Sequence, residues 1–197
     1  PTAANRYVGS YVTREVNGST YTFGKGVVNV NGGSYFKATY GNFWMSEGAL
    51  NVSDAGTRVQ IAQDGYGYRC WMCLGNGSTS EVNVLNGATM DASASEFYTN
   101  YGDYSTGNIT VDGGSVLTIY NQLHGGNEGS FVVGYYARNG EGNVYVTNGS
   151  TMNVGSYNAV LARDDNSGGS TAYIYVDGTS KMTMNHVRAY TGTTVEN

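Results

Sequence analysis

Few residues in this chain have the types and spacing that catalysis requires. Asp112 and Asp177 stand at the same place in two copies of a repeated pattern, and Thr147 takes that place in the copy between them. Two coils of a stacked structure would separate the carboxylates by about 10 Å, whereas retaining glycosidases need about 5 Å and inverting ones about 6.5–9.5 Å. Asp is also common in turns for backbone reasons. We therefore expect both residues to be turn residues and the chain not to be an enzyme.

A denser charged cluster, Arg163-Asp164-Asp165, lies in a polar segment. The cluster has the groups to bind calcium or to supply an arginine base for a lyase reaction. A solvated loop is the simpler interpretation, because no second acidic cluster accompanies it. The histidines, His124 and His186, lack a supporting motif for a Ser–His–Asp arrangement. A polysaccharide lyase or hydrolase is therefore the least favoured class, and no metal or cofactor is expected.

Cys70 and Cys73 form a Cys-x-x-Cys pair. A structural zinc site needs four ligands, and a redox pair belongs at a helix N-terminus, whereas these residues lie in an apolar run typical of a strand. Three residues of extended chain span about 10 Å, beyond the roughly 7 Å between Cα atoms that a disulfide allows. The favoured interpretation is two small apolar side chains on opposite faces of a strand, and a disulfide in a tight turn is the alternative.

The elements that must position these residues follow from a pattern that occurs six times. Each copy has two apolar residues spaced by one, a turn rich in Asn, Asp, Gly or Ser, and two more apolar residues spaced by one. The first pairs are Val28/Val30, Leu50/Val52, Val82/Val84, Ile109/Val111, Val144/Val146 and Ile174/Val176. The second pairs are Phe36/Ala38, Val59/Ile61, Met90/Ala92, Leu117/Ile119, Met152/Val154 and Met182/Met184.

Apolar residues at alternate positions mark a strand with one buried face. Successive copies are 22, 32, 27, 35 and 30 residues apart, and a period of this length indicates stacked units whose like strands pair in parallel. A third apolar run, such as Phe43-Trp44-Met45, gives three strands per coil. The sequence thus predicts an all-β fold, a single-stranded parallel β-helix (β-solenoid) of about six to seven coils. Right-handed coiling follows from the general crossover preference.

The composition narrows the partners and the location. Charged residues make up 13% of the chain, the formal net charge is −5 and the sequence pI is about 4.8. This balance argues against nucleic acid, which needs a basic face, and against electrostatic attraction to a membrane. The longest apolar run is about five residues, short of the roughly 20 that span a bilayer, so no membrane insertion is expected. The Lys-poor, Tyr- and Asn-rich surface favours an extracellular or cell-surface location.

Residues between the paired apolar positions are expected to point outward. On the first strands they would form a row along the rod that contains Asn29, Asn51, Asn83, Tyr145 and Tyr175. Such a row is either a flat face for a glycan or for another rod, or a set of cross-strand pairs that stabilises the sheet.

N-glycosylation is a further expectation for the polar surface. Asn-Gly-Ser is also a sequence that these turns favour for backbone reasons, so the motif does not by itself establish a glycan. The five sequons lie at Asn17, Asn51, Asn76, Asn108 and Asn148.

Both ends of the chain depart from the repeat. Residues 1–24 contain only a half copy and are assigned as an N-terminal strand segment or half coil, and residues 25–197 as the solenoid. After Met184 a new coil begins, and it lacks a polar cap, so strand edges would be exposed. We expect head-to-tail stacking, with residues 1–24 donated to a neighbouring subunit; the alternative is a piece of a longer solenoid. The interface residues would be Tyr7, Val8, Tyr11, Val12, Val16, Val187, Tyr190 and Val195.

Residues 107–119 and 142–155 carry the clearest copies of the repeat. They resemble the β-strand repeats of bacterial autotransporter passengers and related surface proteins, over about residues 26–185. The resemblance implies a secreted or surface-displayed protein, but this architecture carries adhesins, fibres and enzymes alike. The expected function is an extracellular structural subunit whose main partner is itself. The alternative is a glycan-binding adhesin or passenger fragment, with surface glycans as partners.

Overall fold

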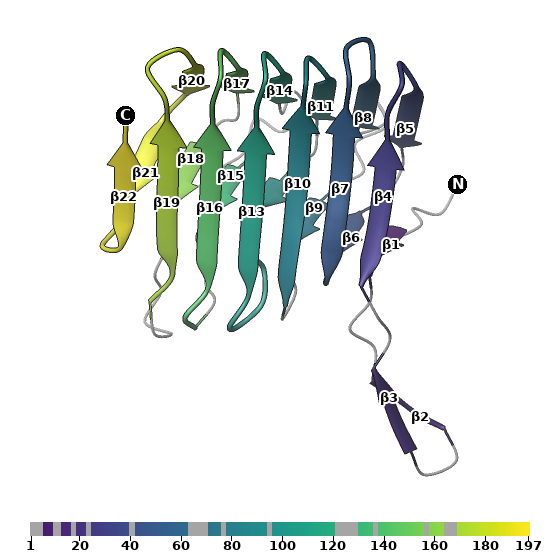
Figure 1. Ribbon diagram of the computed structural model, residues 1–197. Coiled ribbons are helices and arrows are strands. Elements are labelled where there is room, and N and C mark those ends of the chain that lie inside the picture. The colour runs from purple at the N-terminus through teal and green to yellow at the C-terminus, as the bar shows by residue number, and fades with distance from the viewer. Residues whose placement is uncertain are drawn as a thin grey trace.

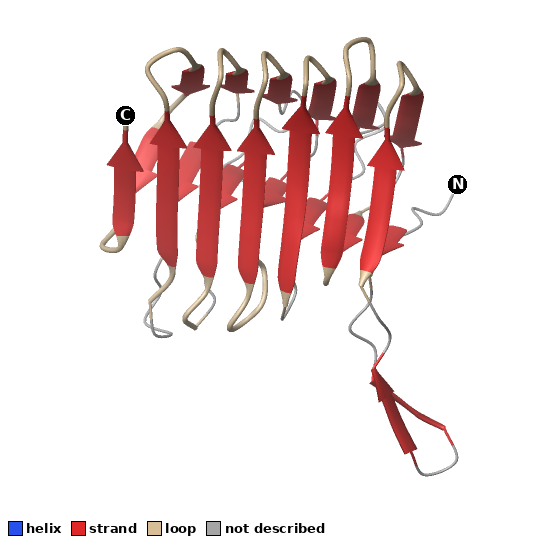
Figure 2. Ribbon diagram, viewed as in Figure 1, coloured by secondary structure: helices blue, strands red, loops and turns tan. Residues whose placement is uncertain are grey.

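The computed structural model is all-β and consists of three parallel sheets with an additional hairpin (Figures 1 and 2). It describes residues 6–9, 13–16, 19–22, 25–39, 42–62, 71–75, 78–93, 96–120, 130–135, 138–155, 158–163 and 169–197. Within these ranges the elements are strands, turns and bends without helix. The chain passes through the three sheets in turn, one strand in each, and then moves one layer along the rod.

Three sheets form the walls of the solenoid, and all pairs within them are parallel. Sheet 1 contains β4 (Gly26–Val30), β7 (Gly48–Ser53), β10 (Thr79–Leu85), β13 (Thr106–Val111), β16 (Glu141–Val146), β19 (Thr171–Val176) and β22 (Thr193–Glu196). Sheet 2 contains β5 (Tyr35–Thr39), β8 (Arg58–Ala62), β11 (Thr89–Ser93), β14 (Val116–Ile119), β17 (Thr151–Val154) and β20 (Lys181–Met184). Sheet 3 contains β1 (Arg6–Val8), β6 (Phe43–Met45), β9 (Trp71–Leu74), β12 (Glu96–Tyr98), β15 (Ser130–Val133), β18 (Asn158–Leu161) and β21 (Val187–Ala189).

This arrangement confirms the predicted parallel β-solenoid with three strands per coil. The first and second apolar pairs lie on strands of sheets 1 and 2, and the third apolar runs lie on strands of sheet 3. The hand of the coil and the total number of coils stay predictions.

Side chains that recur in the sequence form continuous columns inside the rod. In sheet 1, one column runs from Val28 through the equivalent residues of each strand to Ile174 and Val195. In sheet 3, Phe97 and Phe131 are fully buried neighbours, with ring centroids 5.7 Å apart and planes at 66°. Burying each large apolar side chain contributes about 1.5–3 kcal/mol, so the columns are the main source of stability.

The turn between sheets 1 and 2 depends on residues that tolerate positive φ. Asn148 and Gly149 have φ of 54° and 75°, and Asn86 and Gly87 have 57° and 80°. Asn and Gly are the residues that adopt this conformation most readily. The predicted Asn-Gly turns are therefore confirmed, and they redirect the chain around the coil instead of closing a hairpin.

The N-terminal segment divides into two parts. Strand β1 pairs in parallel with β6 of the same chain. Strands β2 (Thr13–Val16) and β3 (Ser19–Thr22) form an antiparallel hairpin that lies away from the stacked coils (Figure 1). The sequence predicted a strand segment or a half coil there. The pairing of β2 with β3 is antiparallel because a gap of only two residues joins antiparallel strands but is far too short for a parallel crossover. Donation of residues 1–24 to a neighbouring subunit stays a prediction.

Candidate interaction surfaces

The asparagine row on the outer face of sheet 1 is a hydrogen-bonded ladder. Asn51 Nδ2 donates to Asn29 Oδ1 at 2.8 Å, and Asn83 Nδ2 donates to Asn51 Oδ1 at 2.9 Å. Such bonds each contribute about 0.5–1.5 kcal/mol. The Asn row therefore stabilises the sheet.

Three tyrosines occupy the other half of this face. Tyr145 of β16 lies opposite Tyr175 of β19 in the parallel register, as expected from the sequence. Tyr173, which the sequence analysis did not single out, lies beside Tyr145 with ring centroids 5.8 Å apart and planes at 52°. Its hydroxyl donates to the Glu196 carboxylate at 2.7 Å, and this bond raises the pKa of Tyr173. The alternation of Tyr and apolar residues along β19 was the available signal for Tyr173.

Asp112 and Asp177 are acceptors in the turns between sheets 1 and 2. Asp112 Oδ1 accepts from Thr147 Oγ1 at 2.5 Å and from Asn148 Nδ2 at 2.6 Å. Asp177 Oδ2 accepts the Asn148 backbone N–H at 2.7 Å, and this bond is the largest cause that holds the pKa of Asp177 below its ordinary value. Both carboxylates therefore join turns of successive coils, which is the structural role expected from their place in the repeat.

Buried Ser150 ties the same turns together. Its Oγ accepts from the backbone N–H groups of Gly114 at 3.1 Å and Ser115 at 3.2 Å. We expect Ser150→Ala to lower the free energy of unfolding by about 1–3 kcal/mol, because a buried donor loses its acceptor. Urea denaturation followed by circular dichroism measures this.

Thr183→Ala is the matched control for Ser150→Ala. Thr183 is exposed and its hydroxyl donates to Asn153 Oδ1 at 3.2 Å, so its loss should change stability by no more than about 0.5 kcal/mol. Equal effects of the two substitutions would contradict a special role of the buried hydroxyl.

The outer face of sheet 3 carries an aromatic cluster that the sequence analysis missed. It consists of Trp44, Trp71, Tyr98, Tyr101 and Tyr135. Tyr101 is at its centre, with its ring centroid 5.0 Å from that of Trp44 and stacked on Tyr135 at 5.3 Å. For Trp44, Trp71 and Tyr98 the signal was the apolar run of β6, β9 and β12, because continuous apolar character indicates a strand covered on both faces. Tyr101 and Tyr135 lie after the ends of β12 and β15, outside these runs.

Cys73 and Glu96 lie beside members of the aromatic cluster on this face. Cys73 is buried there, whereas Cys70 lies outside the described residues, so the favoured placement of the two side chains on opposite faces of a strand stays a prediction, and the disulfide stays its alternative. Tyr98 donates a hydrogen bond to Glu96, and burial is the main cause that raises the pKa of Tyr98. The phenol therefore stays protonated and keeps its role as a donor.

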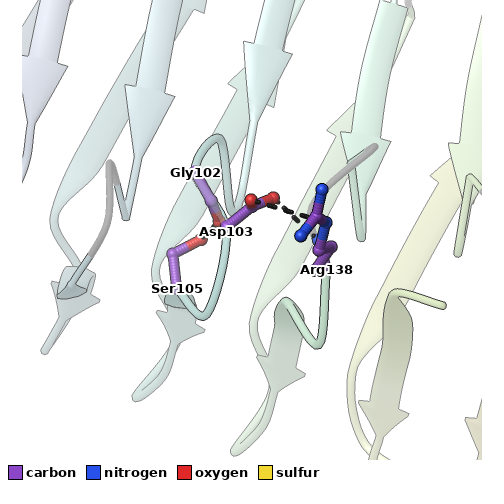
Figure 3. A network of polar contacts seen from close by, with 4 residues as sticks. All are labelled: Gly102, Asp103, Ser105 and Arg138. Atoms are coloured by element: carbon purple, nitrogen blue, oxygen red, sulfur yellow. Dashed lines mark hydrogen bonds and ion pairs between the residues drawn. The ribbon is translucent and has the colours of Figure 1, made fainter. Parts of the chain in front are cut away.

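A polar network joins two turns at the corner between sheets 3 and 1 (Figure 3). Asp103 Oδ1 accepts the backbone N–H of Arg138 at 2.9 Å, and its Oδ2 lies 3.9 Å from Arg138 Nε. Ser105 donates to the Gly102 carbonyl within the first turn. Because both charged side chains are exposed, their ion pair contributes only about 0–1 kcal/mol. We therefore assign the network the role of holding the two turns in place relative to each other.

The remaining chemical candidates are not brought together. Arg163 is half-buried next to β18, and Asp164, Asp165 and His124 lie outside the described residues. His186 is exposed in the bend before β21. Over the described ranges, no group of three or more His, Cys, Asp or Glu could hold a metal ion. The same part of the chain has no helix long and apolar enough to cross a membrane.

The predicted glycosylation residues lie in different settings. Asn51 and Asn108 lie on strands of sheet 1, where Asn108 Oδ1 accepts from Asn143 Nδ2 at 3.0 Å. Asn148 is exposed in a turn, and Asn17 and Asn76 lie outside the described residues. A glycan would be attached to the amide nitrogen, which already donates in Asn51 and Asn148. Glycosylation stays a prediction.

Some of the predicted assembly residues lie at the ends of the rod. Val187, Tyr190 and Val195 are exposed large side chains at the β20–β22 end, and Val8 is buried at the opposite end. Tyr7 lies in β1 and Val16 in β2, whereas Tyr11 and Val12 lie outside the described residues.

Comparisons with protein-family models, with curated proteins and with solved structures found no match. The fold itself therefore defines the class, which is the parallel β-solenoid proteins. Because this architecture supports many functions, any function has to be argued from the surfaces described above.

Proposed function

We propose that this protein is an extracellular structural subunit that stacks head to tail with copies of itself into a filament or surface fibre. The observation that carries the proposal is the complementarity of the unpaired strand edges at the two ends of the described solenoid. A right-handed rod of about six to seven coils, with a Lys-poor polar surface, is part of the same proposal.

The incomplete layers at the two ends fit together. Strand β22 extends sheet 1 beyond the last complete coil, and β1 extends sheet 3 before the first one. Two copies can stack so that β22 of one copy and β1 of the next lie in the same layer of the rod. In sheet 1, β22 of the first copy then pairs with β4 of the second. In sheet 3, β21 of the first copy pairs with β1 of the second. Sheets 1 and 3 then continue without a break, and sheet 2 has no described strand in the shared layer.

The apolar columns also continue across this junction. Val195 occupies the column of Ile174, and its side chain is 59% exposed. The same column begins at Val28, which packs against the core but is only partly buried. Stacking would cover Val195 with Val28 of the next copy, and burial of such side chains contributes about 1.5–3 kcal/mol each. Because the two contacting surfaces differ, the contact does not close and produces a filament.

A charge placed in this column tests the proposal. We expect the unaltered chain to form uniform fibres in electron micrographs and to sediment as large species at raised concentration. Val195→Asp should remain monomeric, because it would bury an unpaired carboxylate at the junction. Circular dichroism establishes that the variant keeps its β structure.

Val27→Asp is the matched control for Val195→Asp. Val27 is a similarly exposed valine, at 52%, but it lies at an outward position of sheet 1. This variant should still form fibres. A chain that stays monomeric at every concentration, or loss of fibres in both variants, would overturn head-to-tail stacking.

A further inference from the structure

We propose that the outer face of sheet 1 contains a binding site for a neutral polysaccharide. The site is the tyrosine patch, defined as Tyr145, Tyr173 and Tyr175. The proposal is independent of end-to-end stacking, because the patch lies on the side of the rod.

The three rings are held in a fixed arrangement by the sheet. Tyr145 lies on β16, and Tyr173 and Tyr175 lie at alternate positions of the neighbouring strand β19. All three side chains are half-buried, so part of each ring faces solvent. Tyrosine offers a large amphipathic surface at low entropy cost, and its ring packs against the apolar face of a pyranose while its hydroxyl bonds to sugar oxygens.

The charge of the face selects the class of glycan. The seven described strands of sheet 1 contain Glu81, Glu141 and Glu196 but neither Lys nor Arg. An anionic polysaccharide would therefore be repelled along the whole face, whereas a neutral glycan would not. Sheet 2, in contrast, carries the cations Lys37, Arg58 and Lys181 on its strands.

Polar groups beside the patch can bind hydroxyl groups. Asn143 and Asn108 continue the outer row in which Tyr173 lies, and they share one hydrogen bond of 3.0 Å. Each side-chain amide has two donors and two acceptor lone pairs, so that bond leaves capacity for a ligand. Adjacent strands are about 4.8 Å apart, close to the length of one sugar unit in an extended chain. A glycan that runs along the rod would therefore place successive sugars over β16 and β19.

Cross-strand stabilisation is the competing explanation for tyrosines on a sheet face. Tyr35 shows what that role looks like on sheet 2. Its hydroxyl donates to Gln60 Oε1 at 2.7 Å, and the Arg58 guanidinium lies 5.7 Å from the centroid of its ring. Tyr35 is thus an exposed strand tyrosine engaged with its own neighbours, and Tyr35→Ala is the control. Because Tyr173 is likewise engaged through its bond to Glu196, the test replaces Tyr145 and Tyr175.

Affinity electrophoresis in native gels tests the proposal. The gels contain hydroxyethyl cellulose, mixed-linkage β-glucan or galactomannan as neutral probes, and alginate as the anionic probe. We expect at least one neutral glycan to retard the protein, with little dependence on salt, and alginate not to do so. The double variant Tyr145→Thr/Tyr175→Thr should bind about tenfold more weakly, and Tyr35→Ala should bind normally.

Threonine is the replacement because Thr110 already occupies the same outward row, so the sheet should tolerate it. The urea midpoint and the fibre assay show whether the double variant folds and still assembles, which separates this proposal from head-to-tail stacking. Absence of retardation by all three neutral glycans, retardation by alginate alone, or unchanged binding by the folded double variant would overturn the site. If the double variant does not fold, the single variant Tyr175→Thr gives the same readout.

Discussion

Replacing Phe97 by alanine should lower the free energy of unfolding by about 3–5 kcal/mol. Phe97 is completely buried in a column of sheet 3, between Met72 and Phe131. Its ring meets that of Phe131 edge to face at 5.7 Å, so the substitution removes an aromatic contact and leaves a cavity. The backbone ladders on both sides hold the neighbouring strands apart, and the cavity cannot collapse easily. Urea denaturation followed by circular dichroism gives the size of the loss.

Phe36→Ala is the comparison for this prediction. Phe36 packs against the same core from β5, the first described strand of sheet 2, and is only partly buried. Its removal should therefore cost clearly less than removal of Phe97. Equal losses for the two variants would show that the columns are not packed as the structure indicates.

The second large effect is expected at Gly107. A Cβ atom there would lie 1.1 Å from the Thr99 carbonyl oxygen and 2.3 Å from its carbonyl carbon. Because both atoms are backbone, β13 itself would have to move, together with its pairing to β10 and β16. We expect Gly107→Ala to lose more than about 3 kcal/mol of stability or to accumulate as insoluble protein. Soluble yield and the denaturation midpoint measure this.

Gly178→Ala uses the same chemical change at an open position. No heavy atom lies within 4 Å of the Cβ position there. Alanine restricts the unfolded chain more than glycine, so the change should be neutral or stabilise by about 0.4–1 kcal/mol. A Gly107→Ala protein as stable as Gly178→Ala would show that the corner between sheets 3 and 1 has room that the structure does not show.

The two proposed surfaces would act together in a fibre. The ends of each rod would be covered by stacking, and the tyrosine patch would recur once per subunit along the side of the filament. A long glycan would then meet several patches at once, and its overall affinity would exceed that of one patch by multivalent binding. Val195→Asp and the tyrosine variants separate the two effects, because the first removes stacking and leaves each patch intact.

The sequence by itself determined the strands of sheets 1 and 2, their parallel pairing and much of their outer face. The alternation of apolar and polar residues allows each strand only one buried face. Leu50 and Val82 therefore had to share an inner column, and Asn51 and Asn83 an outer row. The structure confirms both. The Asn-Gly turns followed equally directly from backbone preferences. These features depend on residues close in sequence, or on a repeat that a single sequence displays.

The tertiary structure alone decided the features that depend on how the corners bring distant residues together. Gly48 and Gly107 share a register with Ser80 and Ala172, and the atom that crowds each glycine differs: the Gly26 carbonyl oxygen lies 1.8 Å from the Cβ position of Gly48, and the Thr99 carbonyl oxygen lies 1.1 Å from that of Gly107. The contact of Tyr101 with Tyr135 and the antiparallel pairing of β2 with β3 likewise have no counterpart in the repeat. The physical reason is that a repeat fixes pairing along each column, whereas contacts across corners depend on loop paths that vary from coil to coil.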